Sequence, residues 1–173
     1  MKILMLAPPG GGKGTQGIRV AEALGVEHIS SGELLREAVA QDTPLGREVA
    51  AHMAAGRLAP DAVVTQAVKP VLEQRDGYVL DGFPRTIAQT AGIDFDLVLY
   101  LDVPDDVITG RLLARGRADD TADVIVQRLR QYEADTEPLV EHYRKLGILV
   151  RVDGDRPADE ITADLLARVR RSD

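Results

Sequence analysis

The feature of this chain that most constrains its fold is a glycine-rich turn close to the N-terminus. Residues 10–15 read GGGKGT and follow the apolar run ILMLA at residues 3–7 after two prolines. An apolar strand that ends in such a turn brings several backbone N–H groups and one lysine to the same small volume, which suits a polyphosphate. Taken alone, the string also fits an ordinary turn with a solvated lysine. The phosphate-loop interpretation therefore depends on the rest of the chain.

A second short apolar strand supports that interpretation. The sequence YVLDGFPR at residues 78–85 ends its apolar run in Asp81, which is followed by a turn and by Arg85. Enzymes with a phosphate loop hold Mg²⁺ with a carboxylate at the end of a neighbouring strand, usually through the water shell of the ion. We therefore predict a magnesium site at Asp81 and the hydroxyl of Thr15.

The composition favours one compact domain. The chain has 173 residues, of which 45% are hydrophobic, and no shift in composition marks a second domain. Cysteine is absent, which excludes disulfides and a cysteine-based structural zinc site. The formal net charge of −7 argues against nucleic acid or an anionic membrane as a partner. The chain starts with strand residues and has no apolar run of ~18 residues, so we expect a cytoplasmic protein. We also expect a monomer.

Short apolar runs alternate with amphipathic stretches along the chain. We expect strands at residues 2–7, 27–29, 78–81, 97–102 and 148–152, and helices at about 14–24, 32–40, 44–55, 61–74, 105–115, 121–145 and 158–171. Asp61, Thr121 and Asp159 are typical helix starts, and Gly25 and Gly147 are typical helix ends. This pattern predicts an α/β fold with a central five-stranded parallel sheet flanked by helices. Its ligands should lie at the carboxyl ends of the strands.

Four strings, in this order, resemble the adenylate kinase family within the wider group of nucleoside monophosphate kinases. They are PPGGGKGTQ from residue 8, SSGELLR from residue 30, LDGFPRT from residue 80 with Gln89, and RGRADD from residue 115. The resemblance implies the P-loop nucleoside monophosphate kinase fold and the reversible, Mg²⁺-dependent reaction ATP + AMP = 2 ADP, which serves adenine nucleotide homeostasis. It also implies one kinase domain over 1–173, with an AMP-binding subdomain at 30–59 and a short lid at 114–120.

On the ATP side, the resemblance implies contacts from the loop and from a group of arginines. Arg111 and Arg115 are four residues apart, so they share one face of a predicted helix. A solvated ion-pair face would alternate in sign, whereas here Arg111, Arg115 and Arg117 precede two aspartates. The implied ATP-binding residues are Gly10, Gly11, Gly12, Lys13, Gly14, Thr15, Arg111, Arg115 and Arg156. The implied catalytic residues are Lys13, Arg85, Arg115, Arg117 and Arg128.

On the AMP side, the resemblance implies two arginine contacts to phosphate, from Arg36 and Arg85, and a base contact from Gln89. A guanidinium can bind phosphate with two parallel hydrogen bonds, and an amide offers both a donor and an acceptor to adenine. The implied AMP-binding residues are Ser31, Arg36, Arg57, Leu58, Ala59, Gly82, Phe83, Pro84, Arg85, Gln89, Arg117 and Arg128. Plain structural alternatives exist for some: a helix cap for Ser31, and surface arginines at 36, 57, 128 and 156.

The histidines and the residue at position 7 do not carry this resemblance. His28, His52 and His142 show no metal-binding spacing and are interpreted as surface or packing residues. Ala7 stands where the general phosphate-loop pattern has its first glycine.

A UMP/CMP kinase is the nearest alternative function. A non-catalytic nucleotide-binding regulator is a second, although binding alone does not require arginines around the point of transfer.

We predict that AMP is preferred over UMP and CMP as acceptor by at least about 10² in kcat/KM. UMP/CMP kinases of similar build typically have alanine and asparagine at the positions of Ser31 and Gln89. A buried amide that faces the wrong base leaves hydrogen-bonding groups unpaired, and each unpaired group costs ~1–3 kcal/mol of binding free energy. Two such mismatches therefore suffice for a preference of about 10². The measurement is a coupled assay for ADP with each acceptor in turn. Comparable rates with UMP and AMP would contradict the adenylate assignment and leave the kinase assignment intact.

Overall fold

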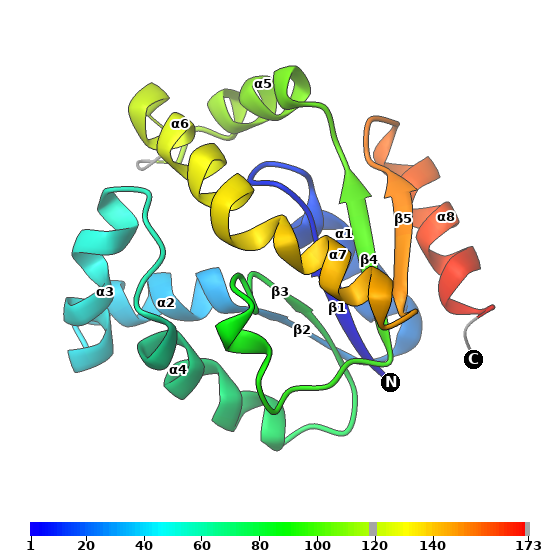
Figure 1. Ribbon diagram of the computed structural model, residues 1–173, viewed down its shortest axis with the longest axis horizontal. Helices are drawn as coiled ribbons and strands as arrows, with labels where there is room; N and C mark the ends of the chain where they lie inside the picture. The colour runs from blue at the N-terminus through cyan, green and yellow to red at the C-terminus, as the bar shows by residue number, and fades with distance from the viewer. Residues whose placement is uncertain (118–120, 172–173) are drawn as a thin grey trace.

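Five parallel strands form the centre of the protein (Figure 1). The computed structural model describes residues 1–117 and 121–171. The strands are β1 (Lys2–Leu6), β2 (Glu27–Ser30), β3 (Tyr78–Asp81), β4 (Leu97–Asp102) and β5 (Leu149–Asp153), in the order β2-β3-β1-β4-β5. The predicted sheet is confirmed. Because β1 lies in the middle and β3 is its neighbour, the loop after β1 and the residues after β3 leave the sheet side by side.

Helices cover both faces of the sheet, so alternate residues of each strand enter different cores. Ile3 and Met5 pack in a cluster with residues of α1 (Lys13–Leu24) and α8 (Ala158–Val169). Leu4 and Leu6 pack on the opposite face, in a cluster with residues of α2 (Ser31–Ala40), α3 (Pro44–Ala54), α4 (Asp61–Glu73) and α7 (Pro138–Lys145). Burial on both faces explains the continuous apolar strands.

The remaining helices lie above the carboxyl ends of the strands. A smaller cluster, which includes Ile108, Leu112 and Ile125, joins α5 (Asp105–Arg115) to α6 (Ala122–Gln131). The short 3₁₀ helix η1 (Ala88–Thr90) follows β3. Figure 1 shows α6 and α7 running in succession across the molecule, with α5 beside α6.

The prediction of a single helix over 121–145 is wrong in the middle of that range. The chain widens into a π-helical turn, η2 (Tyr132–Thr136), between α6 and α7, and the backbone N–H of Glu137 donates to the carbonyl of Tyr132 at 2.8 Å. The cause is Pro138, which has no N–H group and whose ring would collide with the carbonyl four residues earlier in a continuous α-helix. The widened turn directs Tyr132 and Thr136 toward the carboxyl end of the sheet.

The predicted helix ends are mostly correct. Thr121 is the N-cap of α6 and accepts from the backbone N–H of Val124, and Gly25 ends α1 in the left-handed conformation at φ 66°. Asp61 and Asp159 lie in the first turns of α4 and α8, where the caps are prolines. The sequence therefore located these ends to within one or two residues.

Helices α2 and α3 approach each other closely at Gly46. A Cβ atom on Gly46 would lie 2.0 Å from the carbonyl oxygen of Ala38, which no side chain can tolerate. Gly110, in the middle of α5, has open space around the same position. Substitution by alanine should therefore affect stability differently at these two helical glycines.

We predict that Gly46→Ala and Gly110→Ala have opposite effects on stability. Helix propensity alone favours alanine, and Gly110→Ala should raise the free energy of unfolding by about 0.5–1 kcal/mol. Gly46→Ala should lower it by at least about 2 kcal/mol, because α2 and α3 must move apart. Urea unfolding of both variants is the measurement. A stabilised Gly46→Ala protein would show that the two helices are not in contact there.

Candidate active site

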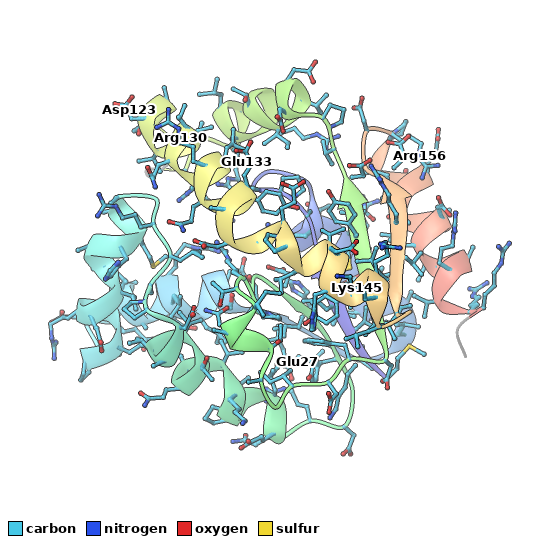
Figure 2. All side chains as sticks on the ribbon, in the orientation of Figure 1. Glu27, Asp123, Arg130, Glu133, Lys145 and Arg156 are labelled. Carbon is cyan, nitrogen blue, oxygen red and sulfur yellow. The ribbon has the colours of Figure 1, made fainter. Side chains whose placement is uncertain are left out.

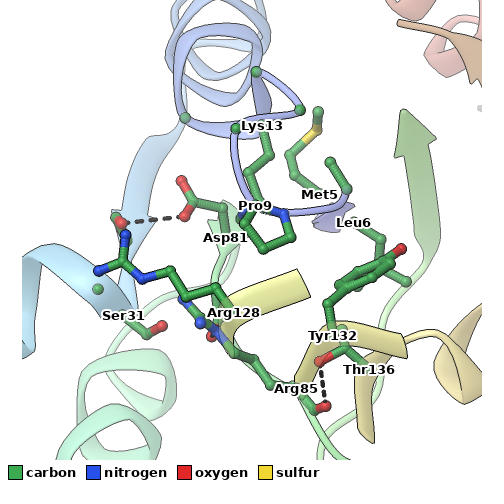
Figure 3. A pocket seen from close by; sticks show the side chains of 18 of the residues that line it. Met5, Leu6, Pro9, Lys13, Ser31, Asp81, Arg85, Arg128, Tyr132 and Thr136 are labelled. Atoms are coloured by element: carbon green, nitrogen blue, oxygen red, sulfur yellow. Dashed lines mark hydrogen bonds between the residues drawn. The ribbon is translucent and has the colours of Figure 1, made fainter. Parts of the chain in front are cut away.

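A cavity of about 700 Å³ opens at the carboxyl ends of the strands. Its walls come from the loop after β1, the start of α2, the segment between α3 and α4, the residues after β3, and from α5, α6 and the β5–α8 loop. Figure 3 shows Lys13, Asp81, Arg85 and Arg128 directed toward the same space. Segments far apart in the sequence thus meet at one site.

All but one of the candidate residues described above line this cavity. The exception is Phe83, whose side chain is fully buried in the core below the cavity. Its neighbours Gly82 and Pro84 do line the cavity, so this segment offers mainly backbone to a ligand. Part of the predicted lid at 114–120, including the two aspartates of RGRADD, lies outside the described residues.

The loop after β1 places the start of α1 against the cavity. Gly12 adopts φ 90°, a left-handed conformation that glycine enters at no steric cost, and α1 begins at the next residue. The first N–H groups of a helix have no partner within the helix and carry the positive end of its dipole. The predicted phosphate loop therefore has the geometry of an anion-binding helix start.

Ala7 and Gly11 form a packed pair at the base of this loop. Ala7 is 4% exposed, and a Cβ atom on Gly11 would lie 2.8 Å from the Cβ atom of Ala7 and 3.0 Å from the carbonyl oxygen of Pro8. There is room for one methyl group at this place. The alanine in place of the first loop glycine is thus accommodated by the glycine at position 11.

Lys13 carries its charge in an unfavourable place. Burial and the nearby charge of Arg85 lower the pKa of Lys13 from 10.5 to about 8, although Asp81 acts in the opposite direction. A buried ammonium group that is not fully compensated attracts an anion strongly. An anion that enters the cavity would therefore relieve the unfavourable charge of Lys13.

Asp81 is the carboxylate at the centre of the cavity, and it is 5% exposed. Its Oδ2 atom lies 2.7 Å from Nε2 of His28, and its Oδ1 atom accepts from the hydroxyl of Ser30 at 3.1 Å. Burial opposes ionisation, but the His28 hydrogen bond and the charge of Lys13 outweigh it, so the pKa of Asp81 lies below its ordinary value. Asp81 is an anion in the folded protein.

His28 and Ser30 were not identified as site residues from the sequence. They reach Asp81 because β2 pairs with β3 in a register that places Ser30 opposite Asp81. The signal in the sequence was two polar residues, two positions apart, in a short strand that reads EHIS. Without the order of the strands, that signal could not be connected to Asp81.

Arg85 is held in place by its neighbours and lies among other cations. Its Nε donates to the carbonyl of Gly82 at 2.8 Å, and its own carbonyl accepts from the hydroxyl of Thr136 at 2.8 Å (Figure 3). Burial lowers the pKa of Arg85, with Asp81 opposing the shift and Arg128 and Arg36 adding to it. Positive charge thus exceeds negative charge here, as the binding of several phosphates requires.

Hydrogen bonds anchor the wall of the cavity next to α8. Arg111 donates from Nη2 to the carbonyl of Gly154 at 3.0 Å, and Arg156 donates from Nη2 to Asp164 at 2.9 Å. Gln16 donates from Nε2 to the carbonyl of Ala158 at 3.0 Å. These bonds fix the β5–α8 loop relative to α1 and α5.

On the other side of the cavity, buried polar groups lie beside backbone. Ser31 and Gln89 are both buried and line the cavity, together with Leu58 and Ala59. The amide of Gln89 accepts from the backbone N–H of Arg85 at 2.7 Å and donates to Asp61 at 2.8 Å. Gln89 is thus immobilised at the edge of the cavity.

The chain matches the adenylate kinase family over residues 5–148. It is 44% identical to an adenylate kinase of Nocardia farcinica, with 99% of this chain and 100% of the relative aligned. It is 42% identical to an adenylate kinase 1 of a Nostoc species, with 96% and 97% aligned, and 39% identical to an adenylate kinase of Halobacterium salinarum, with 96% and 95% aligned.

The chain belongs to the adenylate kinase family. It is therefore an enzyme, a phosphotransferase with the reaction ATP + AMP = 2 ADP, and the family assignment drawn from the four strings is confirmed. Within the part of the chain that the structure describes, no helix has the length and apolar character needed to cross a membrane.

We predict that Ala7→Gly changes ATP affinity less than about fivefold, roughly 1 kcal/mol, since it only opens a small space. Gly11→Ala should cost about 1–3 kcal/mol of stability or ATP binding, because two methyl groups then compete for one place. Ala7→Gly combined with Gly11→Ala should recover part of that loss. Melting temperature and ATP titration of the three variants measure this. Strictly additive effects would contradict the pairing.

We predict that Lys13→Met destroys activity and stabilises the ligand-free protein. Turnover should fall at least about 10²-fold because a cation at the transition state is lost. The free energy of unfolding near neutral pH should rise by about 1 kcal/mol, because an unfavourable buried charge is removed.

The pH dependence follows from the same shift. Between the folded pKa of about 8 and the unfolded value near 10.5, the unfolded chain binds more protons at this lysine, so Lys13 makes stability rise with pH. That rise should be missing in Lys13→Met. Unfolding at about pH 7 and about pH 10 tests it, with the exposed Lys145→Met as control. An unchanged pH slope would show that Lys13 is not electrostatically strained.

Proposed function

We propose that this cavity is the site at which the γ-phosphoryl group of ATP passes to AMP. The observation that supports this is the convergence of the helix start at Lys13, the carboxylate of Asp81 and several arginines on one cavity. Such a site combines an anion cradle, a metal-binding oxygen and excess positive charge, which phosphoryl transfer between two nucleotides requires.

Lys13 and the N–H groups of residues 10–15 would bind the β- and γ-phosphates of ATP. Arg115, Arg117 and Arg128 would surround the phosphoryl group in transit and neutralise the charge of its oxygens. The acceptor is already an anionic phosphate oxygen, so no general base is needed. The protein contributes position, charge and the exclusion of water.

The residues of the cavity fit Mg²⁺. Mg²⁺ is usually held by one or two protein oxygens, with water and substrate phosphates completing an octahedron. Asp81 offers one ionised carboxylate and Thr15 one exposed hydroxyl at the mouth of the loop. When bound, the ion would draw together the phosphate oxygens and neutralise part of their charge. His28 and Ser30 would keep Asp81 oriented toward it.

AMP would bind on the other side of the cavity. Arg36 and Arg85 would bind its phosphate, and Gln89, Ser31 and the backbone of residues 57–59 would bind its base and sugar side. Residues 30–59 and 114–120 would close over the two nucleotides as an AMP-binding subdomain and a short lid. We assign the protein to the cytoplasm as a monomer, in keeping with a role in adenine nucleotide homeostasis.

We predict that turnover depends on Mg²⁺ and on Asp81. EDTA should abolish ADP formation and excess Mg²⁺ should restore it. A zinc-selective chelator should have no effect, because the chain has no cysteine. Asp81→Asn should lower kcat at least about tenfold and raise the Mg²⁺ concentration needed.

The matched control is Asp102→Asn. Asp102 also ends a strand, but it pairs with the exposed Arg151 outside the cavity, so its Mg²⁺ dependence should equal that of the wild type. Turnover without Mg²⁺, or an Asp81→Asn enzyme with the wild-type Mg²⁺ requirement, would refute the role of Asp81.

A further inference from the structure

The amide of Gln89 is held from two sides by partners of fixed hydrogen-bonding character. Its Oε1 accepts from the backbone N–H of Arg85, and its Nε2 donates to Oδ1 of Asp61. A backbone N–H can only donate, and an ionised carboxylate can only accept. A glutamine amide fills nearly the same space when it is turned by 180°, so its orientation is decided by such partners. Here both partners require the same orientation.

This orientation determines which base edge the amide can pair with. Gln89 is 3% exposed and lines the cavity, so it can still offer the second hydrogen of Nε2 and the second lone pair of Oε1. Adenine presents an amino donor beside a ring-nitrogen acceptor, which this pair matches. Hypoxanthine and uracil present a carbonyl acceptor beside a ring N–H donor, and they match the amide only after it has turned.

We infer that Asp61 is a positioning residue that sets the acceptor-base preference by holding Gln89 in the orientation that pairs with an amino-substituted base. Asp61 occupies the first position of α4 and is not part of the cavity wall, so it acts through Gln89 and does not touch the base. The inference rests on the proposed contact between Gln89 and the base of AMP.

A purely structural role for Asp61 makes a different prediction. The Asp61–Gln89 hydrogen bond also ties α4 to η1, and a carboxylate in a first helical turn stabilises the helix. Loss of those effects would change stability and would change binding of all acceptors alike. Loss of the amide orientation changes the ratio between acceptors that differ only at the base edge. AMP and inosine monophosphate (IMP) are such a pair, because they have the same size and opposite donor and acceptor patterns.

The test is the ratio of kcat/KM for AMP and IMP in Asp61→Asn. Asparagine keeps the size of the side chain and can hydrogen-bond to the amide of Gln89 in either orientation. We expect the AMP/IMP ratio to fall about tenfold, since one charge-assisted hydrogen bond no longer selects the orientation. The Arg85 N–H remains, so some preference should persist. The KM for ATP should stay within about twofold, as the donor side is untouched.

Both acceptors are measured on one preparation, so the ratio does not depend on the folded fraction. Asp61→Ala should change it in the same direction. Asp105→Asn is the matched control, because it removes an exposed carboxylate from the first turn of α5 and should leave the ratio unchanged. In a Gln89→Leu background, Asp61→Asn should have no further effect on the ratio.

The outcomes separate this inference from the proposed function. An unchanged ratio in Asp61→Asn, or an equal change in the Gln89→Leu background, would overturn the positioning role while AMP remains the acceptor. A wild-type protein that did not phosphorylate AMP would instead contradict the proposed function itself.

Discussion

The structure depends on one buried carboxylate that lies among cations. Burial lowers the pKa of both Lys13 and Arg85, neighbouring cations add to each shift, and Asp81 is the anion that opposes both. Cations that lie close together in a partly buried cavity repel one another. Asp81 must therefore be ionised and fixed, and the hydrogen bonds from His28 and Ser30 keep it so.

The sheet provides this arrangement through its strand order. β3 lies between β1 and β2, so Asp81 has the phosphate loop on one side and the two polar residues of β2 on the other. The central strands β1, β3 and β4 are buried on both faces, which makes this end of the sheet a rigid base. Charged groups can be held in unfavourable positions only on such a base, because they would otherwise move into solvent.

Around that base, polar side chains bind backbone groups and set the orientation of their neighbours. Thr136 holds the carbonyl of Arg85, and the N–H of Arg85 in turn binds the amide of Gln89. The widened turn before Pro138 brings Thr136 to this position. A regular helix would have aimed a different residue at Arg85. Arg130 of α6 and Glu133 of the widened turn, both labelled in Figure 2, are exposed, so the same stretch of chain also presents charged side chains to solvent.

The sequence by itself determined the sheet, most helix ends and the glycine-rich loop, and with the family resemblance it identified about half of the residues of the cavity wall. These follow from local rules: apolar runs predict strands, glycines and capping residues mark ends, and GGGKGT and LDGFPR carry their chemistry within a few residues. Only the tertiary structure decided three things: the contact of His28 with Asp81, the orientation of Gln89 by Asp61, and the exclusion of Phe83 from the cavity. Each joins or separates side chains according to strand register and helix packing, which no local pattern encodes.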